Sequence, residues 1–137
     1  MVSRVAVGTD GSPTAAEAVK AAVEIAKRFD SELVLLSAFQ ESAPQGEPDE
    51  LQWAWSPQAR TQEILSRAEE DLKRDGIACK VLVDEGDPAE ILVRLAAECD
   101  ADVLVIGNKG MERRVLGSVP NTVTHKAGCS VFVVKTT

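Results

Sequence analysis

Short apolar runs alternate along the chain with longer segments of helical periodicity. The runs are almost continuously apolar, which is typical of strands buried on both faces of a parallel sheet. Between them, apolar residues recur at the spacing of three and four that marks one face of a helix. The pattern predicts five strands, at residues 3–8, 32–39, 78–83, 102–107 and 130–135.

Polar residues punctuate the segments between these strands. Three of these helical segments open with a capping residue followed by proline, a pair suited to the first turn of a helix. The pairs are Ser12-Pro13, Ser56-Pro57 and Asp87-Pro88. We predict that these helices end near residues 28–30, before Gly76 and near Cys99. A fourth, shorter helix is predicted at about 119–127.

Strict alternation of strands and helices predicts an α/β fold. A parallel sheet joined by right-handed crossovers carries helices on both faces and so forms three α/β/α layers. With 137 residues, the chain is predicted to be a single domain spanning 1–137. Residues 40–55 break the pattern with two prolines, a glycine and four acidic residues, and are predicted to be a flexible excursion. Its Trp53 and Trp55 either cover an apolar edge or serve as a lid or dimer contact.

Two loops at the carboxyl ends of predicted strands carry the candidate chemistry, because ligands of open parallel sheets bind at that edge. One is Gly8–Ser12, with Thr9 and Asp10. A carboxylate at position 10 could accept hydrogen bonds from ribose hydroxyls or a base amino group, or simply cap the turn. Ala38, which closes the second strand, could line a slot for a base or belong to the core.

The second loop runs from Gly107 to Ser118 and leads into the fourth helix. Glycines let a backbone approach a ligand closely, and the first N–H groups of a helix attract anions. The loop also holds a basic island in an acidic protein. The sequence predicts a phosphate site here, with a purely structural loop as the alternative. The residues concerned are Gly107, Lys109, Gly110, Arg113, Arg114, Gly117 and Ser118.

Charge and composition exclude several classes of function. The net charge of −7 disfavours non-specific nucleic-acid binding, which requires a basic face. No apolar run approaches the roughly 20 residues of a membrane span. The first residues lack a signal-peptide layout, so we expect no membrane association and a cytoplasmic location. The three cysteines are far apart and there is one histidine, His125, so no metal site is predicted.

Catalytic motifs are missing from the sequence. There is neither a GxxxxGK followed by Ser or Thr nor a GxGxxG, and no nucleophile–base–acid set is suggested. We therefore expect a protein that is not an enzyme, or at most hydrolyses ATP slowly. A nucleotidyl-transfer enzyme on a related sheet is disfavoured, since such enzymes usually need further His or Lys motifs.

Three stretches together resemble the universal stress protein family over nearly the whole chain. They are VAVGTDGSPTAAEAVKAA, GDPAEILVRLAAECDADVLVIG and VLVIGNKG with GSVPNTVTHKAGCSVFVVK. Nucleotide-binding members carry G-x2-G-x9-G-S/T after the fourth strand. Gly107-x2-Gly110 and Gly117-Ser118 match this motif, but the spacer between them has six residues, three fewer than the family pattern.

The resemblance implies a Rossmann-like sheet, similar to that of adenine nucleotide alpha hydrolases, of strand order 3-2-1-4-5. It implies an adenine nucleotide ligand, ATP or cyclic AMP, and a role in stress response or signalling. With ATP, Asp10 could help hold Mg²⁺ through water. The resemblance also implies a homodimer paired through the last strand, Ser130–Lys135. The residues placed at the nucleotide are Gly8, Thr9, Asp10, Ala38, Ile106, Gly107, Gly110, Gly117, Ser118 and Val119, with Lys109, Arg113 and Arg114 contributing charge to the phosphates.

One alternative stays open at this point. The shortened spacer could mark a member that no longer binds nucleotide and acts instead as an interaction or chaperone-like dimer.

Overall fold

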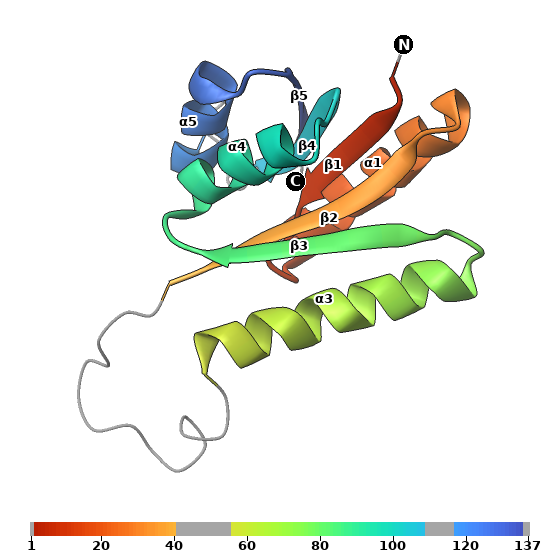
Figure 1. Ribbon diagram of the computed structural model, residues 1–137, viewed down its shortest axis with the longest axis horizontal. Helices are drawn as coiled ribbons and strands as arrows, with labels where there is room; N and C mark the ends of the chain where they lie inside the picture. Colours follow the sequence, from red (N-terminus) through yellow and green to blue (C-terminus); the bar gives the residue numbers. More distant parts are fainter. Residues whose placement is uncertain (1, 41–55, 109–116, 136–137) are drawn as a thin grey trace.

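The computed structural model describes residues 2–40, 56–108 and 117–135. Strands and helices alternate through these residues, as the sequence predicts (Figure 1). The elements are β1 (Arg4–Gly8), α1 (Pro13–Phe29), β2 (Glu32–Phe39), α3 (Pro57–Arg74), β3 (Cys79–Glu85), α4 (Pro88–Glu98), β4 (Val103–Asn108), α5 (Ser118–Lys126) and β5 (Ser130–Lys135).

Five parallel strands form one sheet in the order β3-β2-β1-β4-β5. The strand β1 lies at the centre, where Val5 pairs with Leu33 of β2 on one side and Val103 of β4 on the other. The chain winds outward from β1 to β3, then crosses back to β4 and β5. The α/β fold class and the strand order 3-2-1-4-5 are confirmed.

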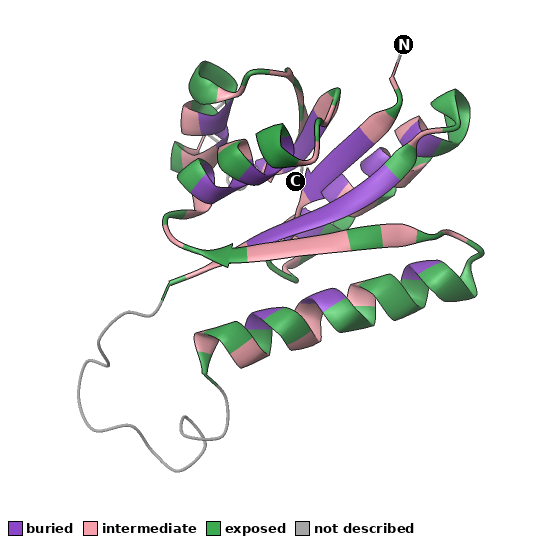
Figure 2. Cartoon of the chain, viewed as in Figure 1, coloured by how far each residue is buried: buried purple, intermediate pink, exposed green. Residues whose placement is uncertain are grey.

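Neighbouring residues of each strand face opposite layers of helices. In β1, Val5 and Val7 pack with α1 and α3, whereas Ala6 packs with α4 and α5. Both clusters are buried along the central strands (Figure 2). Burying a Val or Leu side chain stabilises a fold by roughly 1.5–3 kcal/mol, so burial on both sheet faces explains why the central strands are almost continuously apolar.

The predicted helix starts are confirmed by their hydrogen bonds. The Ser12 hydroxyl accepts the Ala15 N–H at 3.1 Å, and the Ser56 hydroxyl accepts the Ala59 N–H at 3.1 Å. The Asp87 carboxylate likewise accepts the Glu90 N–H at 3.2 Å. Such caps satisfy donors that the first helical turn leaves without a partner.

The helix end predicted before Gly76 is also confirmed. Gly76 has a left-handed φ of 79°, which favours glycine. Its N–H donates to the Lys73 carbonyl at 3.0 Å, and the Ile77 N–H donates to the Leu72 carbonyl at 2.8 Å. This pair of bonds is the Schellman motif, which closes the last turn of α3.

One boundary prediction was wrong. The sequence predicted that the third strand ends at residue 83, before Asp84 and Glu85. In the structure both belong to β3, paired with Ala38 and Phe39 of β2. Both residues are exposed. Their carboxylates therefore stay in contact with water, and the edge strand β3 can continue through them.

Several predictions lie outside the described residues. They concern the excursion at 40–55, of which only Gln40 is described, and its two tryptophans. The same holds for the loop residues Lys109, Gly110, Arg113 and Arg114.

Candidate functional site

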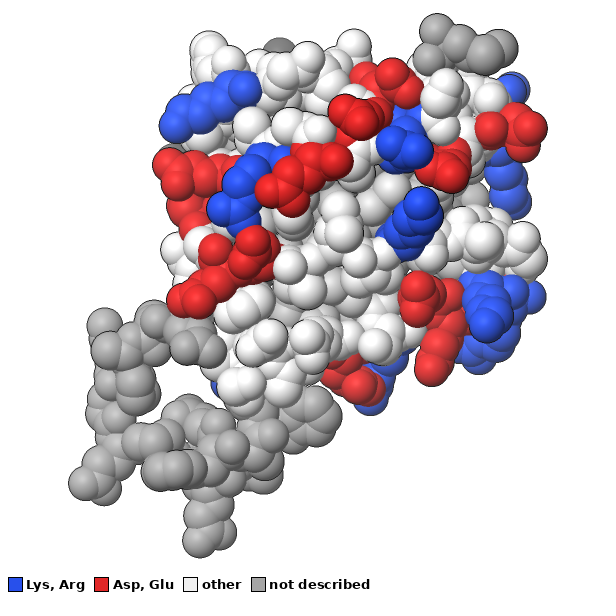
Figure 3. Space-filling view, in the orientation of Figure 1, with Lys and Arg blue, Asp and Glu red and all other residues white. Residues whose placement is uncertain are grey.

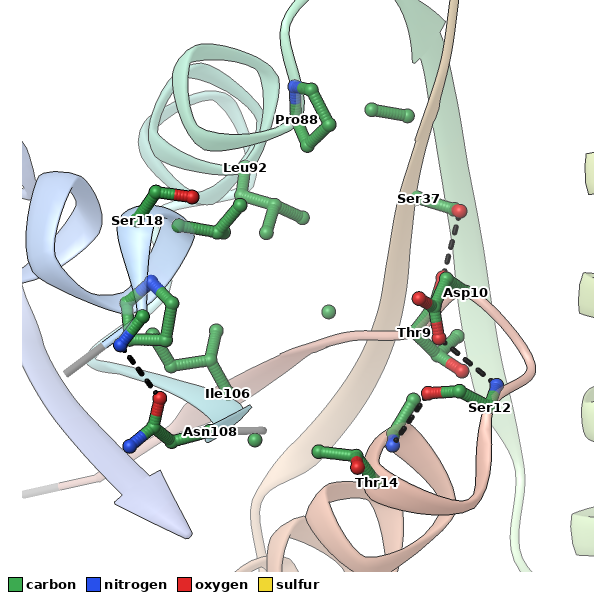
Figure 4. A pocket seen from close by; sticks show the side chains of 17 residues that line it. Thr9, Asp10, Ser12, Thr14, Ser37, Pro88, Leu92, Ile106, Asn108 and Ser118 are labelled. Atoms are coloured by element: carbon green, nitrogen blue, oxygen red, sulfur yellow. Dashed lines mark hydrogen bonds between the residues drawn. The ribbon is translucent and has the colours of Figure 1, made fainter. Parts of the chain in front are cut away.

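A cavity of about 350 Å³ opens at the carboxyl ends of β1, β2 and β4 (Figure 4). The strands β1 and β4 are neighbours in the sheet, and the chain leaves them in opposite directions. This is the point of reversed strand order at which open α/β sheets bind ligands. The loop after β1, the end of β4 and the start of α5 meet here.

Every predicted binding residue within the described part of the chain lines this cavity: Gly8, Thr9, Asp10, Ala38, Ile106, Gly107, Gly117, Ser118 and Val119. The sequence thus selected residues that the fold brings together from three strands and a helix. Their contact with a ligand stays a prediction.

The loop after β1 is held by its own hydrogen bonds. The Thr9 N–H donates to the Leu36 carbonyl at 2.9 Å, and the Ser37 hydroxyl donates to the Thr9 carbonyl at 2.7 Å. Asp10 Oδ1 accepts the Ser12 N–H at 2.9 Å. The turn-capping role considered for Asp10 is therefore present in the structure. The capped turn fixes the backbone that carries this carboxylate at the cavity.

The opposite wall comes from the end of β4 and the start of α5. Gly117 is the cap residue of α5 and provides no side-chain cap. Its N–H donates to Asn108 Oδ1 at 2.8 Å. Ser118 and Val119, the first two residues of the helix, line the cavity. N–H groups in this position have no partner within the helix and favour an anion.

The remaining wall is apolar. Pro88 and Leu92 reach the cavity from α4, with Leu92 on the side of Ile106 (Figure 4). Ala38 also lines the cavity. Gly8 makes room for Leu92, because a Cβ there would lie 3.0 Å from Leu92 Cδ1. An apolar wall opposite polar loop groups is the usual make-up of a small-molecule site.

Sequence reasoning missed the other residues of the lining: Ser12, Thr14, Ala15, Ser37, Pro88, Leu92, Asn108 and Pro120. Several neighbour a predicted residue in sequence, so the alternation of strand and loop could have indicated them. The exceptions are Pro88 and Leu92, because no local signal shows that α4 leans over the carboxyl ends of β1 and β2.

Asp10 is the one charged side chain among the described lining residues. The N-termini of α1, α4 and α5 all contribute to the lining, and their dipoles favour negative charge. No group of three or more His, Cys, Asp or Glu side chains suited to a metal ion occurs in the described ranges. The described lining thus supplies one carboxylate and helix termini, which suit a phosphorylated ligand better than a metal ion.

Charges elsewhere are mixed. On the face seen in Figure 3, acidic and basic side chains are interspersed, and Arg94 of α4 pairs with Asp84 of β3. The cysteines are free, and burial raises the pKa of the thiols of Cys79, Cys99 and Cys129. A raised thiol pKa lowers the fraction of reactive thiolate at neutral pH.

The chain matches the model of the universal stress protein family over residues 1–135. It belongs to the universal stress protein family. It is 33% identical over 141 residues to a universal stress protein of Methanocaldococcus jannaschii, covering 98% of this chain and 83% of that protein. It is 37% identical over 147 residues to one of Mycobacterium tuberculosis, covering 97% of this chain and 96% of that protein.

A solved universal stress protein in complex with cyclic AMP has a similar fold. The TM-score is 0.76 at 30% sequence identity, and the match covers 99% of both chains. As for membranes, no helix in the described ranges is both long enough and apolar enough to cross one.

Proposed function

We propose that this universal stress protein binds an adenine nucleotide, ATP or cyclic AMP, in the cavity at the carboxyl ends of β1 and β4. One observation carries the proposal: the predicted binding residues of the described chain converge on a single cavity. A family member of 30% identity that was solved with cyclic AMP supports it.

The cavity has complementary groups for each part of the ligand. The adenine ring lies against the apolar side chains of Ala38, Ile106 and Leu92, which all line the cavity. The ribose hydroxyls donate to the Asp10 carboxylate, an acceptor held in place by its turn. The phosphate accepts hydrogen bonds at the start of α5, where the helix dipole favours an anion.

The protein acts by binding rather than by catalysis. A hydrolase needs a base that activates water, and the described lining has one carboxylate, which already caps a turn. Mg²⁺, where present, arrives with the phosphates of ATP, because phosphate oxygens supply much of its preferred ligand set. We expect ATP turnover far below about 1 s⁻¹, the lower range of typical enzymes.

The molecule works as a cytoplasmic homodimer in stress response or signalling, joined through β5. This strand lies at the edge of the sheet and carries an exposed Phe132, 48% accessible. An unpaired edge with an apolar side chain invites pairing with a second copy, and a two-fold dimer closes that edge.

Calorimetry tests the binding proposal. Wild type titrated with ATP and with cyclic AMP should release saturable heat with at least one of them. An Ala38→Trp variant should lose that heat, because the indole fills the cavity beside the strand ends. Asp30→Asn, a substitution in the turn after α1, serves as the control. Wild type without heat for either nucleotide would favour the interaction or chaperone-like alternative with its six-residue spacer.

A further inference from the structure

The start of α5 is tied to the end of β4 by one side chain (Figure 4). Asn108, the last residue of β4, is fully buried. Its Oδ1 accepts the N–H of Gly117, the cap residue of α5, at 2.8 Å. A buried amide requires hydrogen-bond partners, since leaving its oxygen unpaired costs roughly 1–3 kcal/mol. The bond therefore fixes where α5 begins relative to the sheet.

Gly117 suits this contact. A Cβ at Gly117 would lie 3.2 Å from Asn108 Oδ1, closer than most side chains tolerate. The backbone has φ −62° and ψ 170°, an ordinary extended conformation, so no left-handed turn requires glycine here. The close approach of the Asn108 side chain is the reason that the structure gives for a glycine at this cap.

The same bond decides which donors of α5 face a ligand. The cap N–H of Gly117 is taken by Asn108. Pro120, the third helical residue, has no N–H, and the N–H of Asn121 donates to the Gly117 carbonyl at 2.9 Å. The N–H groups of Ser118 and Val119 remain, together with the Ser118 hydroxyl, and both residues line the cavity.

We infer that Asn108 is a positioning residue that turns the start of α5 into a subsite for one phosphate group. This inference rests on the proposed nucleotide site. Asn108 lines the cavity, but the role inferred for it runs through Gly117 rather than through a contact with the ligand. It draws the Gly117 N–H onto β4, which orients the two following N–H groups and the Ser118 hydroxyl toward the cavity. Two or three fixed donors match the terminal oxygens of a single phosphate.

A ligand pair separates this role from a merely structural one. Adenosine lacks the phosphate and cyclic AMP carries it, so the change in the ratio of their dissociation constants from wild type to variant reports on the phosphate subsite. The Asn108→Ala variant loses the hydrogen bond that holds the start of α5 to β4. We expect cyclic AMP to bind about tenfold more weakly, the value of one hydrogen bond, and adenosine to change by less than about twofold.

Asn121→Ala is the matched control. Asn121 lies on the same helix but is exposed, so its removal should leave both affinities unchanged. Asn108→Ser shortens the side chain without adding charge and carries the test should the alanine variant fail to fold. Its shorter hydroxyl loses the hydrogen bond to Gly117, so cyclic AMP should again bind about tenfold more weakly while adenosine is retained. Hydrogen exchange of the Gly117 amide should be slow in wild type and faster in both Asn108→Ala and Asn108→Ser.

The outcomes are distinct. A selective loss of cyclic AMP affinity supports the positioning role. Equal losses for adenosine and cyclic AMP, or no loss for either, would overturn it and leave the nucleotide site standing. A wild-type protein that binds neither ligand would instead refute the nucleotide site itself, and the subsite with it.

Discussion

Gly107 of β4 lies against Thr14 of α1 with no room for a side chain. A Cβ at Gly107 would lie 2.7 Å from Thr14 Cγ2 and 2.8 Å from the Thr14 carbonyl oxygen. A backbone oxygen cannot rotate away as a side chain can, so the contact holds the start of α1 close to the end of β4. The sequence interpretation assigned this glycine to close approach by a ligand; Gly107 does line the cavity, and the structure gives it a packing role within the protein as well.

Gly107→Ala should therefore destabilise the protein. The added methyl group forces apart α1 and β4, and overpacking of this kind costs about 1–3 kcal/mol. Urea unfolding followed by circular dichroism measures the change. Gly128→Ala is the control, because a Cβ there would meet nothing within 4 Å, and its stability should change by less than about 0.5 kcal/mol. Equal stability of the two variants would refute the packing role.

Asp10 caps its turn and, in the proposed site, also accepts hydrogen bonds from the ribose; different substitutions separate the two roles. Asp10→Asn keeps an oxygen that can accept the Ser12 N–H and removes the charge. Stability should stay within about 0.5 kcal/mol of wild type, while adenosine affinity falls by about 1 kcal/mol as charged hydrogen bonds become neutral. Asp10→Ala removes both, with a binding loss of about 1.5–3 kcal/mol and a stability loss of about 1 kcal/mol.

Calorimetry and urea unfolding give the two numbers for Asp10. Asp87→Ala is the control, because Asp87 caps α4 as Asp10 caps its turn. It should lose stability of similar size and keep affinity. Loss of stability in Asp10→Ala without any change in affinity would assign this carboxylate to the turn alone.

The fold could be predicted from the sequence because its signals are local and repeated. Apolar runs mark the strands, and caps at Ser12, Ser56 and Asp87 mark the helix starts. The order of the strands is a different matter. Periodicity shows that strands alternate with helices, but it does not show which strands pair. The order came from the family resemblance, and the pairing of β1 with both β2 and β4 confirms it.

The candidate site was predictable where it is made of loops that follow strands. Asp10 and Ser118 each stand just after a strand–loop pattern and both line the cavity. Asn108 and Leu92 were missed for a physical reason. Their roles depend on tertiary contacts, the first with the cap of α5 and the second with Gly8 of β1. No periodic or motif signal in one sequence encodes such contacts.

The stability of the protein should depend on pH in the acid range because of the Asp102 carboxyl group. Hydrogen bonds from the N–H groups of Ser3 and Arg4, at 2.8 and 3.0 Å, lower the pKa of this carboxyl below its ordinary value. Its contribution is therefore present above the unfolded-state pKa of about 3.9 and is lost as pH falls through the lower folded-state pKa.

Asp102→Asn should be less stable than wild type at about pH 7, and the difference should shrink below about pH 4. Urea unfolding midpoints at several pH values measure it. Asp75→Asn, at the end of α3, is the control for removing one exposed carboxylate. A difference between wild type and Asp102→Asn that stays constant across the acid range would contradict this account.

Phe132 tests the proposed dimer. Phe132→Asp places a charge on the exposed edge strand β5, where a second copy would pair, and burying an unpaired charge is costly. We expect wild type to sediment as a dimer and Phe132→Asp as a monomer. Phe29→Asp is a matched control, because Phe29 at the end of α1 is 50% exposed, close to the 48% of Phe132. A dimer that survives Phe132→Asp would exclude β5 as the interface.

The most direct test of the nucleotide site is to follow the backbone amide resonances while cyclic AMP and ATP are added. We predict that the shifts from at least one nucleotide cluster on the two walls of the cavity, at Thr9, Asp10, Ser118 and Val119. Amides of α3 facing away from the cavity, such as Arg67 and Glu70, should stay unchanged. Shifts confined to other surfaces, or no shifts at millimolar nucleotide, about the weakest affinity of interest, would contradict the account.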